Sequence, residues 1–589
     1  MASGAYLEWR RATSATSNLV NDMNRLAHSL KISTMAIWTI LATAAAVGQE
    51  LSTIDQQKPF TMGGAVNTNL TASTISGAPR RQDPFSWTVG GSLTPALYGV
   101  QLPFSFIFSS QSKSYTQPFN QFGISPSYKS LRTHLGYRSM SFSRYTMSGT
   151  TFFGAGMEFN AGPVRSAAMV GRFKEAIDED TLNPSATPSY QRNGYAVKLG
   201  FGSERTFFEA SYLHAADDTN SLRNAPTKGD APAENSALGG TMRFGITNSI
   251  AIEAEGGASL YTSNLRAAGV DVDSASSIPD FLTGIYQPRV STSFTMAGRV
   301  GVSWTESDYG VRVGYEYVEP DYATLGAYSF TTDISNWTIA PSLNLLNSAL
   351  RLSGSVGLQS DNVLGNKLAQ TERVIGSFNA GYNSGDWGVD ASYSNYSTNQ
   401  KAGRAPISDS IRARNIMQSA TLAPRLTLQS EDLSQTVALS TGYQEYSDLN
   451  AFTSALTDNR ALTAAASYNV AFLKSKTNVG GSLVYANTQS GLATSNTLSA
   501  SLNGALTMLA NDELSLNGTL SYSTSSVTGT DGASSTIALN IGSTYQLTKE
   551  DNINLSFNAT TNGNTMPGAT GFTELSSSLS YSRSFNIFN

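Results

Sequence analysis

The ten residues YGVRVGYEYV, from Tyr309 to Val318, alternate between two kinds of side chain. Every second position, beginning with Tyr309, is apolar or aromatic, and the positions between them hold glycine, Arg312 and Glu316. Successive side chains of a β-strand point to opposite faces, so this stretch predicts a strand with one apolar and one polar face. Charged groups need water or a partner, and the polar face is therefore expected to border an aqueous space.

The same alternation recurs elsewhere in the chain. Between Ile250 and Leu260 the apolar positions lie opposite Glu253 and Glu255, and leucine and valine between Leu350 and Leu358 lie opposite Arg351 and two serines. Two further examples are Ile553–Phe557 and Leu575–Ile587. Many strands of this kind can form a sheet that faces lipid on one side and water on the other.

Short turn sequences punctuate the chain, most of them about 40 residues apart. Between two such turns lie two strands and one longer polar connection, for example Asp217–Glu234 or Asn399–Arg412. One edge of the sheet is thus expected to have tight turns and the other long loops. The tight turns are expected at Pro95–Leu97, Ala161–Pro163, Ser203–Arg205, Thr247–Ser249, Glu306–Asp308, Asn347–Ser348, Ser384–Asp386, Glu431–Asp432, Lys474–Lys476, Asn511–Asp512 and Lys549–Asp551.

This asymmetry predicts an all-β fold: one transmembrane antiparallel β-barrel over residues 60–589, with short periplasmic turns and long external loops. The tight turns, with both ends of the chain on the same side, give about 24 strands. A soluble β-propeller also repeats near 40 residues, but its blades bury both faces, whereas these strands keep one face polar. The charges expected to face the lumen are Glu253, Glu255, Arg312, Glu316, Arg351 and Asp390.

Composition supports the barrel and excludes several kinds of site. Only 14% of the residues are charged, against about 25% in soluble domains. Cysteine is absent, which excludes disulfides and thiolate chemistry, and three histidines make a histidine metal cluster improbable. A net charge of −5 gives no indication of nucleic-acid binding. No cofactor is expected.

The first 48 residues read as an extension and a cleaved signal peptide. Lys31 precedes the apolar run Met35–Val47, which is too short to span a bilayer as a helix, and Gly48 ends a small-residue cleavage context. Met23 is an alternative start. Residues 49–59 would then form a short periplasmic lead into the barrel.

A basic, aromatic segment from Gln111 to Gly149 interrupts the turn pattern, and no acidic residue lies between Asp83 and Glu158. We interpret it as an external connection folded into or over the lumen, because a barrel wider than 22 strands needs something to narrow it. Rings of arginine and lysine favour anions, and our hypothesis is a constriction with an anion or carbohydrate preference. The expected constriction residues are Lys113, Lys129, Arg132, His134, Arg138, Arg144, Tyr128 and Tyr137.

Two alternatives for this segment remain open. It can be a surface cap with solvated cations and a small aromatic core of its own. Alternatively, Ser127–Tyr137 is a further wall strand, and the barrel has 26 strands.

Candidate catalytic and metal residues are few. His214 with Asp217 and Asp218 is the nearest approach to a catalytic arrangement, but a solvated loop histidine explains it better, and no enzymatic activity is predicted. Asp271 and Asp273 suggest calcium, yet the pattern lacks the third acid and the glycine of an EF-hand loop. No metal site is expected.

Four features resemble the large outer-membrane barrel proteins of Bacteroidota, a group without an agreed activity. They are the mature start at Gln49, QPFNQFG at Gln117–Gly123, TFFGAG at Thr151–Gly156 and ENSALG at Glu234–Gly239. The resemblance implies a multi-pass β-barrel in the cell outer membrane.

The sequence therefore predicts an outer-membrane pore for polar solutes, with residues 111–149 giving an anion or carbohydrate preference. The alternative is a structural or secretion-associated barrel whose long loops bind partner proteins. Expected partners are outer-membrane lipid, the barrel assembly machinery and an unidentified polar solute, with a protein partner under the alternative.

Overall fold

The computed structural model describes residues 58–110, 120–179, 187–224, 226–270, 286–491, 493–509, 513–529, 532–566 and 568–587. The expected signal peptide, Lys113, the Asp271 and Asp273 pair and the turn at Asn511–Asp512 lie outside these ranges. Within them the chain forms 28 β-strands and one single-turn helix, α3 (Ser454–Thr457). No described helix has the length and apolar character needed to cross a membrane.

The strands are β1 Phe60–Ser76, β2 Phe85–Leu97, β3 Val100–Gln101, β4 Phe104–Ser109, β5 Gln121–Ile124, β6 Ser127–Tyr128, β7 Leu131–Ser141, β8 Ser148–Ala161, β9 Val164–Lys174, β10 Arg192–Gly202, β11 Thr206–Asp217, β12 Glu234–Gly245, β13 Ile250–Thr262, β14 Thr292–Thr305, β15 Tyr309–Val318, β16 Ile334–Leu345, β17 Leu350–Ser360, β18 Ala369–Ser384, β19 Trp387–Ala402, β20 Arg414–Gln429, β21 Leu433–Asp448, β22 Asn459–Phe472, β23 Thr477–Ser490, β24 Ala493–Met508, β25 Leu514–Val527, β26 Ala533–Gln546, β27 Asp551–Asn564 and β28 Phe572–Ile587.

The chain divides into two compact units. The described part of the smaller unit consists of residues 58–61 and Ala96–Gln101. There, the end of β2 pairs with β3 across a tight turn in which Tyr98 and Gly99 have φ of 47° and 81°. The Tyr98 backbone N–H donates to the carbonyl of Pro59 at 3.3 Å.

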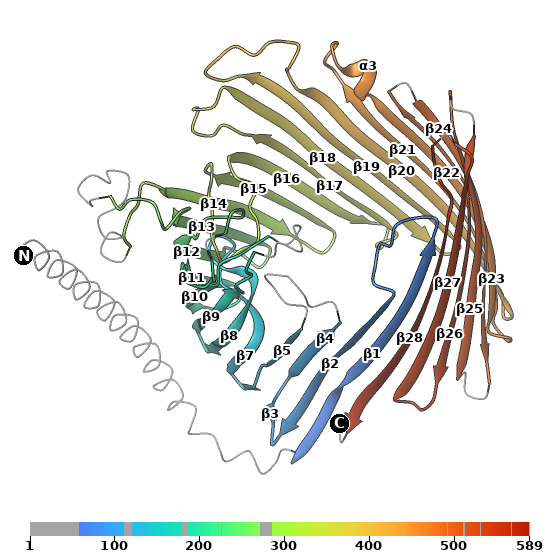
Figure 1. Ribbon diagram of the computed structural model, residues 1–589, viewed down its shortest axis with the longest axis horizontal. Helices are drawn as coiled ribbons and strands as arrows, with labels where there is room; N and C mark the ends of the chain where they lie inside the picture. Colours follow the sequence, from blue (N-terminus) through green and yellow to red (C-terminus); the bar gives the residue numbers. More distant parts are fainter. Residues whose placement is uncertain are drawn as a thin grey trace, which may run out of the picture. The chain divides into compact units, whose positions relative to one another are not determined.

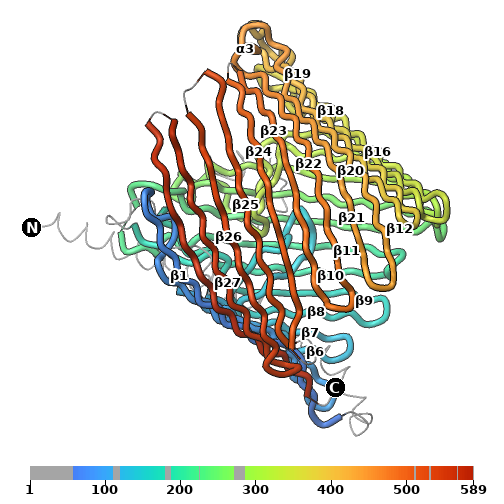
Figure 2. Tube along the Cα trace, turned by 90° about the vertical axis from the view of Figure 1, so that its right-hand side faces the viewer, coloured from blue at the N-terminus to red at the C-terminus, as the bar shows by residue number. Residues whose placement is uncertain are grey.

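The larger unit, Met62–Pro95 and Leu102–Ile587, is a closed antiparallel barrel (Figures 1 and 2). Successive strands pair along the sheet, and β1 closes the ring against β28 from Met62↔Ile587 to Ser76↔Thr573. Apart from the two-residue strands β3 and β6, 26 strands make up the wall. The expected fold class is confirmed. The count of 24 is wrong, and the alternative of 26 is the correct one.

The two additional strands come from the basic, aromatic segment, so the expectation that residues 111–149 form one long connection is wrong. β5 pairs with β4 on one side and β7 on the other, and β7 pairs with β8 over most of its length. The turn that precedes β7 holds Lys129 with φ of 52°. Arg132, His134 and Arg138 occupy alternate positions of β7, so their charges mark a polar strand face.

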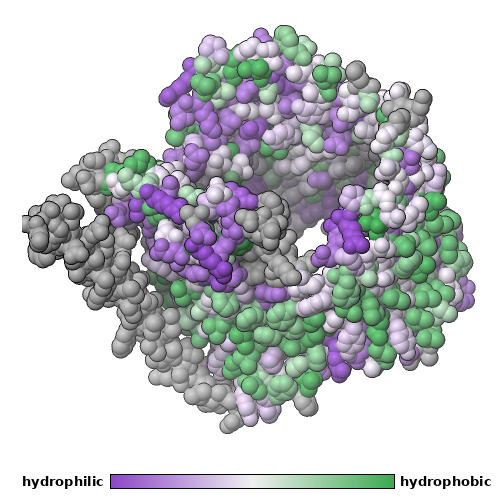
Figure 3. All heavy atoms as spheres, in the orientation of Figure 1, coloured by the Kyte–Doolittle hydropathy of each residue, from purple (hydrophilic) through white to green (hydrophobic). Residues whose placement is uncertain are grey.

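The two faces of the barrel wall differ in polarity. The outward face carries large exposed apolar side chains, such as Phe201 at 68%, Leu199 at 61% and Leu502 at 67%. Figure 3 shows hydrophobic residues gathered on the outer surface of the wall and hydrophilic residues around the hollow interior. This is the arrangement expected for strands that separate lipid from water.

Buried apolar residues are concentrated on one sector of the inner face. Met140, Phe142 and Met147 pack against inward positions of β8 to β12, where Ala167, Ala196, Ala215 and Ala237 leave room for them. A second cluster joins Tyr145 and Tyr322 to Val318 and Ile334. Two connections therefore turn inward and cover this sector of the wall.

Candidate functional site

The two inward connections are the first inner loop (residues 142–147), between β7 and β8, and the second inner loop (residues 319–333), between β15 and β16. The two loops are joined by backbone hydrogen bonds, which form an isolated parallel β-bridge between Met147 and Gly326. The hydroxyl of Thr324 donates to the carbonyl of Thr146 at 2.6 Å, and that of Tyr322 donates to the carbonyl of Tyr145 at 2.5 Å. Burial raises the pKa values of the Tyr145 and Tyr322 hydroxyls above the ordinary value for tyrosine, so both hydroxyls stay protonated and can donate.

The second inner loop is also anchored to the wall. The Leu325 N–H donates to Asn235 Oδ1 at 3.1 Å, and Asn235 Nδ2 donates to Ser259 Oγ at 2.7 Å. Ser259 Oγ in turn donates to the carbonyl of Ala323 at 2.6 Å. Because these partners lie on β12 and β13, the loop is tied to strands far from it in sequence.

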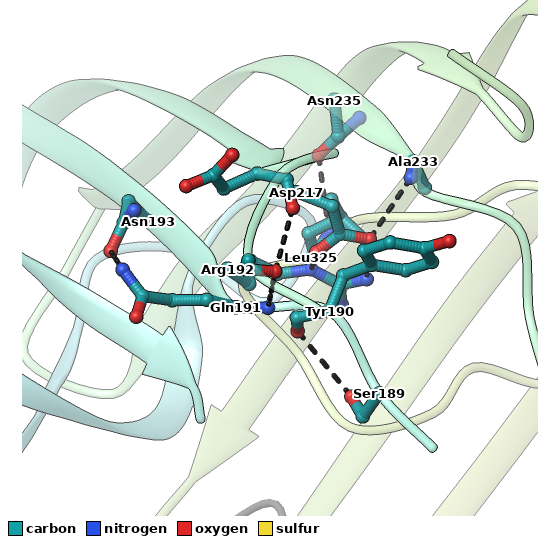
Figure 4. A network of polar contacts seen from close by, with 11 residues as sticks. Ser189, Tyr190, Gln191, Arg192, Asn193, Asp217, Ala233, Asn235 and Leu325 are labelled. Atoms are coloured by element: carbon teal, nitrogen blue, oxygen red, sulfur yellow. Dashed lines mark hydrogen bonds and ion pairs between the residues drawn. The ribbon is translucent and has the colours of Figure 1, made fainter. Parts of the chain in front are cut away.

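An ion pair braces the neighbouring strands (Figure 4). Arg192 donates twice to Asp217, from Nε at 2.8 Å and from Nη2 at 2.9 Å, and the Ala233 N–H donates to the same carboxylate at 2.9 Å. In the figure, Asn235 and Leu325 of the loop contact lie beside this network. Such bidentate, charge-assisted pairs fix geometry well.

At the end of the second inner loop, Asp333 holds the loop to the connection before β18. Its carboxylate accepts from Lys367 Nζ at 2.5 Å and from the N–H groups of Asn362 and Val363, both at 2.9 Å. Burial alone would raise the pKa of Asp333, but these donors outweigh it and hold the pKa below its usual value. The carboxylate is therefore ionised and fully engaged at neutral pH.

Beside the first inner loop, the inner wall from β12 to β16 forms a cavity of about 380 Å³. We call it the arginine–glutamate cleft, and define it by seven charged residues. They are Arg144, Arg243, Glu253, Glu255, Arg299, Arg312 and Glu316. Thr241, Asn336 and Thr338 add polar groups to the lining.

The charges of the cleft are linked in two chains, one made of ion pairs and one of ion pairs joined by a backbone hydrogen bond. Glu253 is contacted by Arg243 Nη1 at 3.1 Å and by Arg312 Nη2 at 2.5 Å. Glu255 is contacted by Arg299 Nη2 at 2.7 Å and accepts from the backbone N–H of Arg144 at 2.6 Å. The Arg144 guanidinium then reaches Glu316 at 3.2 Å, which also accepts from the Tyr145 hydroxyl at 3.2 Å.

The two signs of charge are not equally exposed. The four arginine side chains are between 44% and 60% exposed, whereas the three glutamates are between 8% and 34% exposed. The carboxylates lie beneath the guanidinium groups. The surface that the cleft presents to the lumen is therefore mainly cationic.

The opposite sector of the barrel has a different inner face. From β22 to β27 the inward positions in the described ranges hold serine, threonine, asparagine, glutamine and small apolar residues, and no charged side chain. Hydroxyls pair across strands, as in Ser482 with Ser501 at 2.8 Å and Ser499 with Ser523 at 2.9 Å. Fixed charge is thus confined to part of the lumen.

The strand register places all six charges that the sequence marked for the lumen on the inner face, but in three different places. Glu253, Glu255, Arg312 and Glu316 meet in the cleft. Arg351, on β17, lies opposite Asn344 of β16 and Gly381 of β18. Asp390 on β19 pairs with Arg425 of β20 at 2.8 Å.

The basic and aromatic residues singled out in the sequence do not converge on one point. Arg132, His134 and Arg138 are on the inner face of β7, and Arg144 is in the first inner loop. Tyr128 and Lys129 lie at the tight-turn end of the barrel. Tyr137 faces outward, where its ring packs on Phe153 with centroids 4.7 Å apart.

Sequence reasoning missed Arg243, Arg299 and the second inner loop. Both arginines stand at alternate positions of apolar strands, the signal that was used for Arg312, so they were detectable. The loop gave less indication, because its tyrosines and aspartates are also typical of a solvated connection.

His214 and Asp217 do not form a catalytic pair. They lie three positions apart on β11 and thus point to opposite faces. His214 Nδ1 is 2.9 Å from Ser236 Oγ on the outer face, while Asp217 is held by Arg192 on the inner face. Across the described ranges, no group of three or more histidine, aspartate or glutamate side chains is arranged to hold a metal ion.

No protein-family model matches the chain, and no curated protein matches it. Among solved structures, the translocation pore of the P pilus usher PapC is 12% identical, with a TM-score of 0.34, over 90% of this chain and 100% of the usher chain. OccK2 (OpdF) of Pseudomonas aeruginosa, solved in complex with glucuronate, is 10% identical, with a TM-score of 0.26, over 89% and 98% of the two chains. OpdQ of the same organism is 10% identical, with a TM-score of 0.28, over 90% and 98%. These scores are too low to carry an argument, so the fold rests on the strand pairing above, and the resemblance to Bacteroidota barrels stays a prediction.

Proposed function

We propose that this protein is an outer-membrane pore for polar solutes. The apolar outer face of a closed barrel needs lipid around it, because exposed apolar surface of this extent is unfavourable in water. A closed barrel leaves no unpaired strand edge, which is the condition for crossing a bilayer with strands. Outer-membrane lipid and the machinery that inserts such barrels are the partners that follow from this proposal.

The proposed path runs past the two inner loops. A barrel of 26 strands is wider than the porins of 16 to 18 strands that already leave an aqueous channel, so an unobstructed lumen would pass solutes with little selection. The first and second inner loops occupy one sector of the lumen and are held there by buried packing and hydrogen bonds. They narrow the path on the side that carries fixed charge.

The preference we propose is for anions. The observation that carries it is the exposure difference within the arginine–glutamate cleft, where guanidinium groups cover the carboxylates. A passing anion meets the exposed cations first, and rings of arginine and lysine favour anions in pores. The hydroxyl-rich sector opposite gives neutral hydrogen-bonding partners to the rest of a polar solute.

The test is the reversal potential of single channels in planar bilayers under a potassium chloride gradient. We expect an anion-selective wild type. In the double variant Arg299→Gln and Arg312→Gln the selectivity should shift clearly towards cations, because the carboxylates of Glu255 and Glu253 each lose a guanidinium partner and face the lumen. Arg223→Gln is the matched control, since the Arg223 side chain is 89% exposed on a loop and pairs with Asp178. A cation-selective wild type, or equal selectivity in all three proteins, would contradict the proposal.

A further inference from the structure

A second cavity, of about 340 Å³, lies away from the arginine–glutamate cleft. It is bordered by β2, β4, β5 and β7, and its lining includes Ser92, Ser105, Gln121, Ser125, His134 and Arg138. The described residues that line it include no aspartate and no glutamate. Its volume is within the range of small-ligand pockets and exceeds the share of one water by about tenfold.

Arg138 is the cation of this cavity, and its surroundings differ from those of the cleft arginines. Its Nη1 donates to Ser105 Oγ at 2.6 Å and more weakly to the carbonyl of Tyr137 at 3.3 Å. Its Nε is buried and has no hydrogen-bond partner. Within the described part of the chain, no carboxylate lies within 4.0 Å of it. A partly buried guanidinium without a counter-charge is costly unless something supplies one.

The backbone makes room for this guanidinium. Gly123 of β5 lies beneath it, and a Cβ at that position would come within 2.9 Å of Arg138 Cζ. The carbon of the guanidinium group therefore packs closely against the Gly123 backbone, which a larger residue would prevent. A planar donor fork held in this way suits the oxygens of a carboxylate or phosphate.

The acidic side chain of Glu158, on β8, approaches His134. Glu158 Oε1 lies 3.9 Å from His134 Nε2, too far for a hydrogen bond but on the side of His134 away from Ser125. His134 Nδ1 lies 3.0 Å from Ser125 Oγ, which fixes the ring at the edge of the cavity. The hydroxyls of Ser92, Ser105 and Ser125 thus provide groups near Arg138 that can donate to an anion.

We propose that Arg138 and the hydroxyls of this cavity form a binding site for a small oxyanion, either inorganic phosphate or the carboxylate of a small organic acid. The site's role in transport rests on the proposed pore, but binding to it does not need a current. It would hold an anion on the inner wall at a place separate from the arginine–glutamate cleft. The bound anion would supply the counter-charge that Arg138 lacks.

The test is isothermal titration calorimetry on the purified full-length barrel in detergent, with sodium phosphate and sodium acetate titrated separately at constant ionic strength. We expect saturable binding of at least one anion to the wild type and affinity lower by about tenfold or more for Arg138→Gln, the loss expected for a charge-assisted bidentate contact. Binding of phosphate alone, acetate alone or both identifies the source of the oxyanion. Arg425→Gln is the matched control, because Arg425 is also on the inner wall but is paired with Asp390.

Arg138→Lys separates binding from folding, since it keeps the charge but loses the planar fork, and we expect intermediate affinity. Heat-dependent gel migration checks that each variant is a folded barrel. Absence of saturable binding to the wild type, or equal affinity in wild type and folded Arg138→Gln, overturns this site. Neither result alters the reversal potentials that test the pore itself.

Discussion

Arg144 Nη2 lies 3.2 Å from Glu316 Oε1, so a loop between β7 and β8 is joined to the inner face of β15 across the lumen side of seven intervening strands. The contact is completed by Tyr145, whose hydroxyl donates to the same carboxylate. Glu316 is only 18% exposed at its side chain, which strengthens the interaction relative to a solvated pair. The inner loops and the charged wall are therefore one structure.

Adding a methyl group at Gly257 should displace both inner loops. A Cβ there would lie 2.4 Å from Tyr145 Cβ and 2.7 Å from the Tyr322 hydroxyl oxygen. Overpacking of this kind costs about 1–3 kcal/mol, so Gly257→Ala should lower the thermal stability and raise single-channel conductance. Gly240→Ala is the control, because a Cβ at Gly240 meets nothing within 4 Å. Equal conductance in the two variants would show that the loops do not limit the current.

Asp333 should make the second inner loop sensitive to acid. The folded-state pKa of Asp333 lies below its unfolded value of about 3.9. Its stabilising contribution is thus present above pH 3.9 and is lost as the pH falls through the lower folded value. The protection factors of residues 319–333 in hydrogen exchange, which correct for the intrinsic pH dependence of the rate, should fall in the wild type as the pH drops through that value.

Asp333→Asn should show fast exchange in residues 319–333 already at neutral pH, because the amide keeps one acceptor oxygen and leaves at least one of the N–H donors without a partner, which costs about 1–3 kcal/mol. Asp409→Asn serves for comparison, since Asp409 is 77% exposed and pairs with Arg412 within one turn of chain. If exchange in the loop is the same in both variants, Asp333 is not its anchor.

Substitution by lysine should have different effects on the stability of the barrel at two neighbouring positions of β24. Ser501 faces the lumen and Leu502 faces outward, 67% exposed. Leu502→Lys should destabilise the barrel in lipid by about 2–4 kcal/mol if it lies near the bilayer midplane. Ser501→Lys should fold normally and increase anion selectivity. Urea titration in lipid vesicles measures the first effect, and comparable stability of the two variants would contradict the assigned faces.

The place of β7 in the wall can be tested by thiol labelling, because the chain has no native cysteine. Arg132→Cys should react with a membrane-impermeant maleimide in the folded barrel, since position 132 faces the lumen. Leu135→Cys, on the outer face, should react only after unfolding. Reaction of both at equal rates would place this strand outside the wall.

Alternation and turn chemistry made most of the barrel predictable. Strands such as Tyr309–Val318 show both faces in sequence, and their hydrogen-bonded neighbours repeat the pattern. The place of β7 is harder to predict, because Arg132, His134 and Arg138 resemble a cationic loop in the sequence but form one face of a strand in the structure. The cleft was half predictable: its wall charges follow from the period of two, but the burial of Tyr145 and Tyr322 depends on contacts between loops distant in sequence.

Glycine and alanine at inward positions of the wall are a sequence signal for the inner loops. Inward positions such as Ala196, Ala237 and Gly257 are too small to fill space themselves, and in the structure the inner loops pack over them. A run of small residues on the inner face of adjacent strands indicates that another part of the chain covers that sector.

The most direct test of the pore and its narrowing is the single-channel conductance of the wild type against a variant in which residues 142–147 are replaced by Asn-Gly, a two-residue hairpin turn. Both proteins would be reconstituted in planar bilayers after their folding is verified. The account predicts a conducting wild type and a variant whose conductance is several-fold higher. No current from either folded protein, or the same conductance from both, would contradict it.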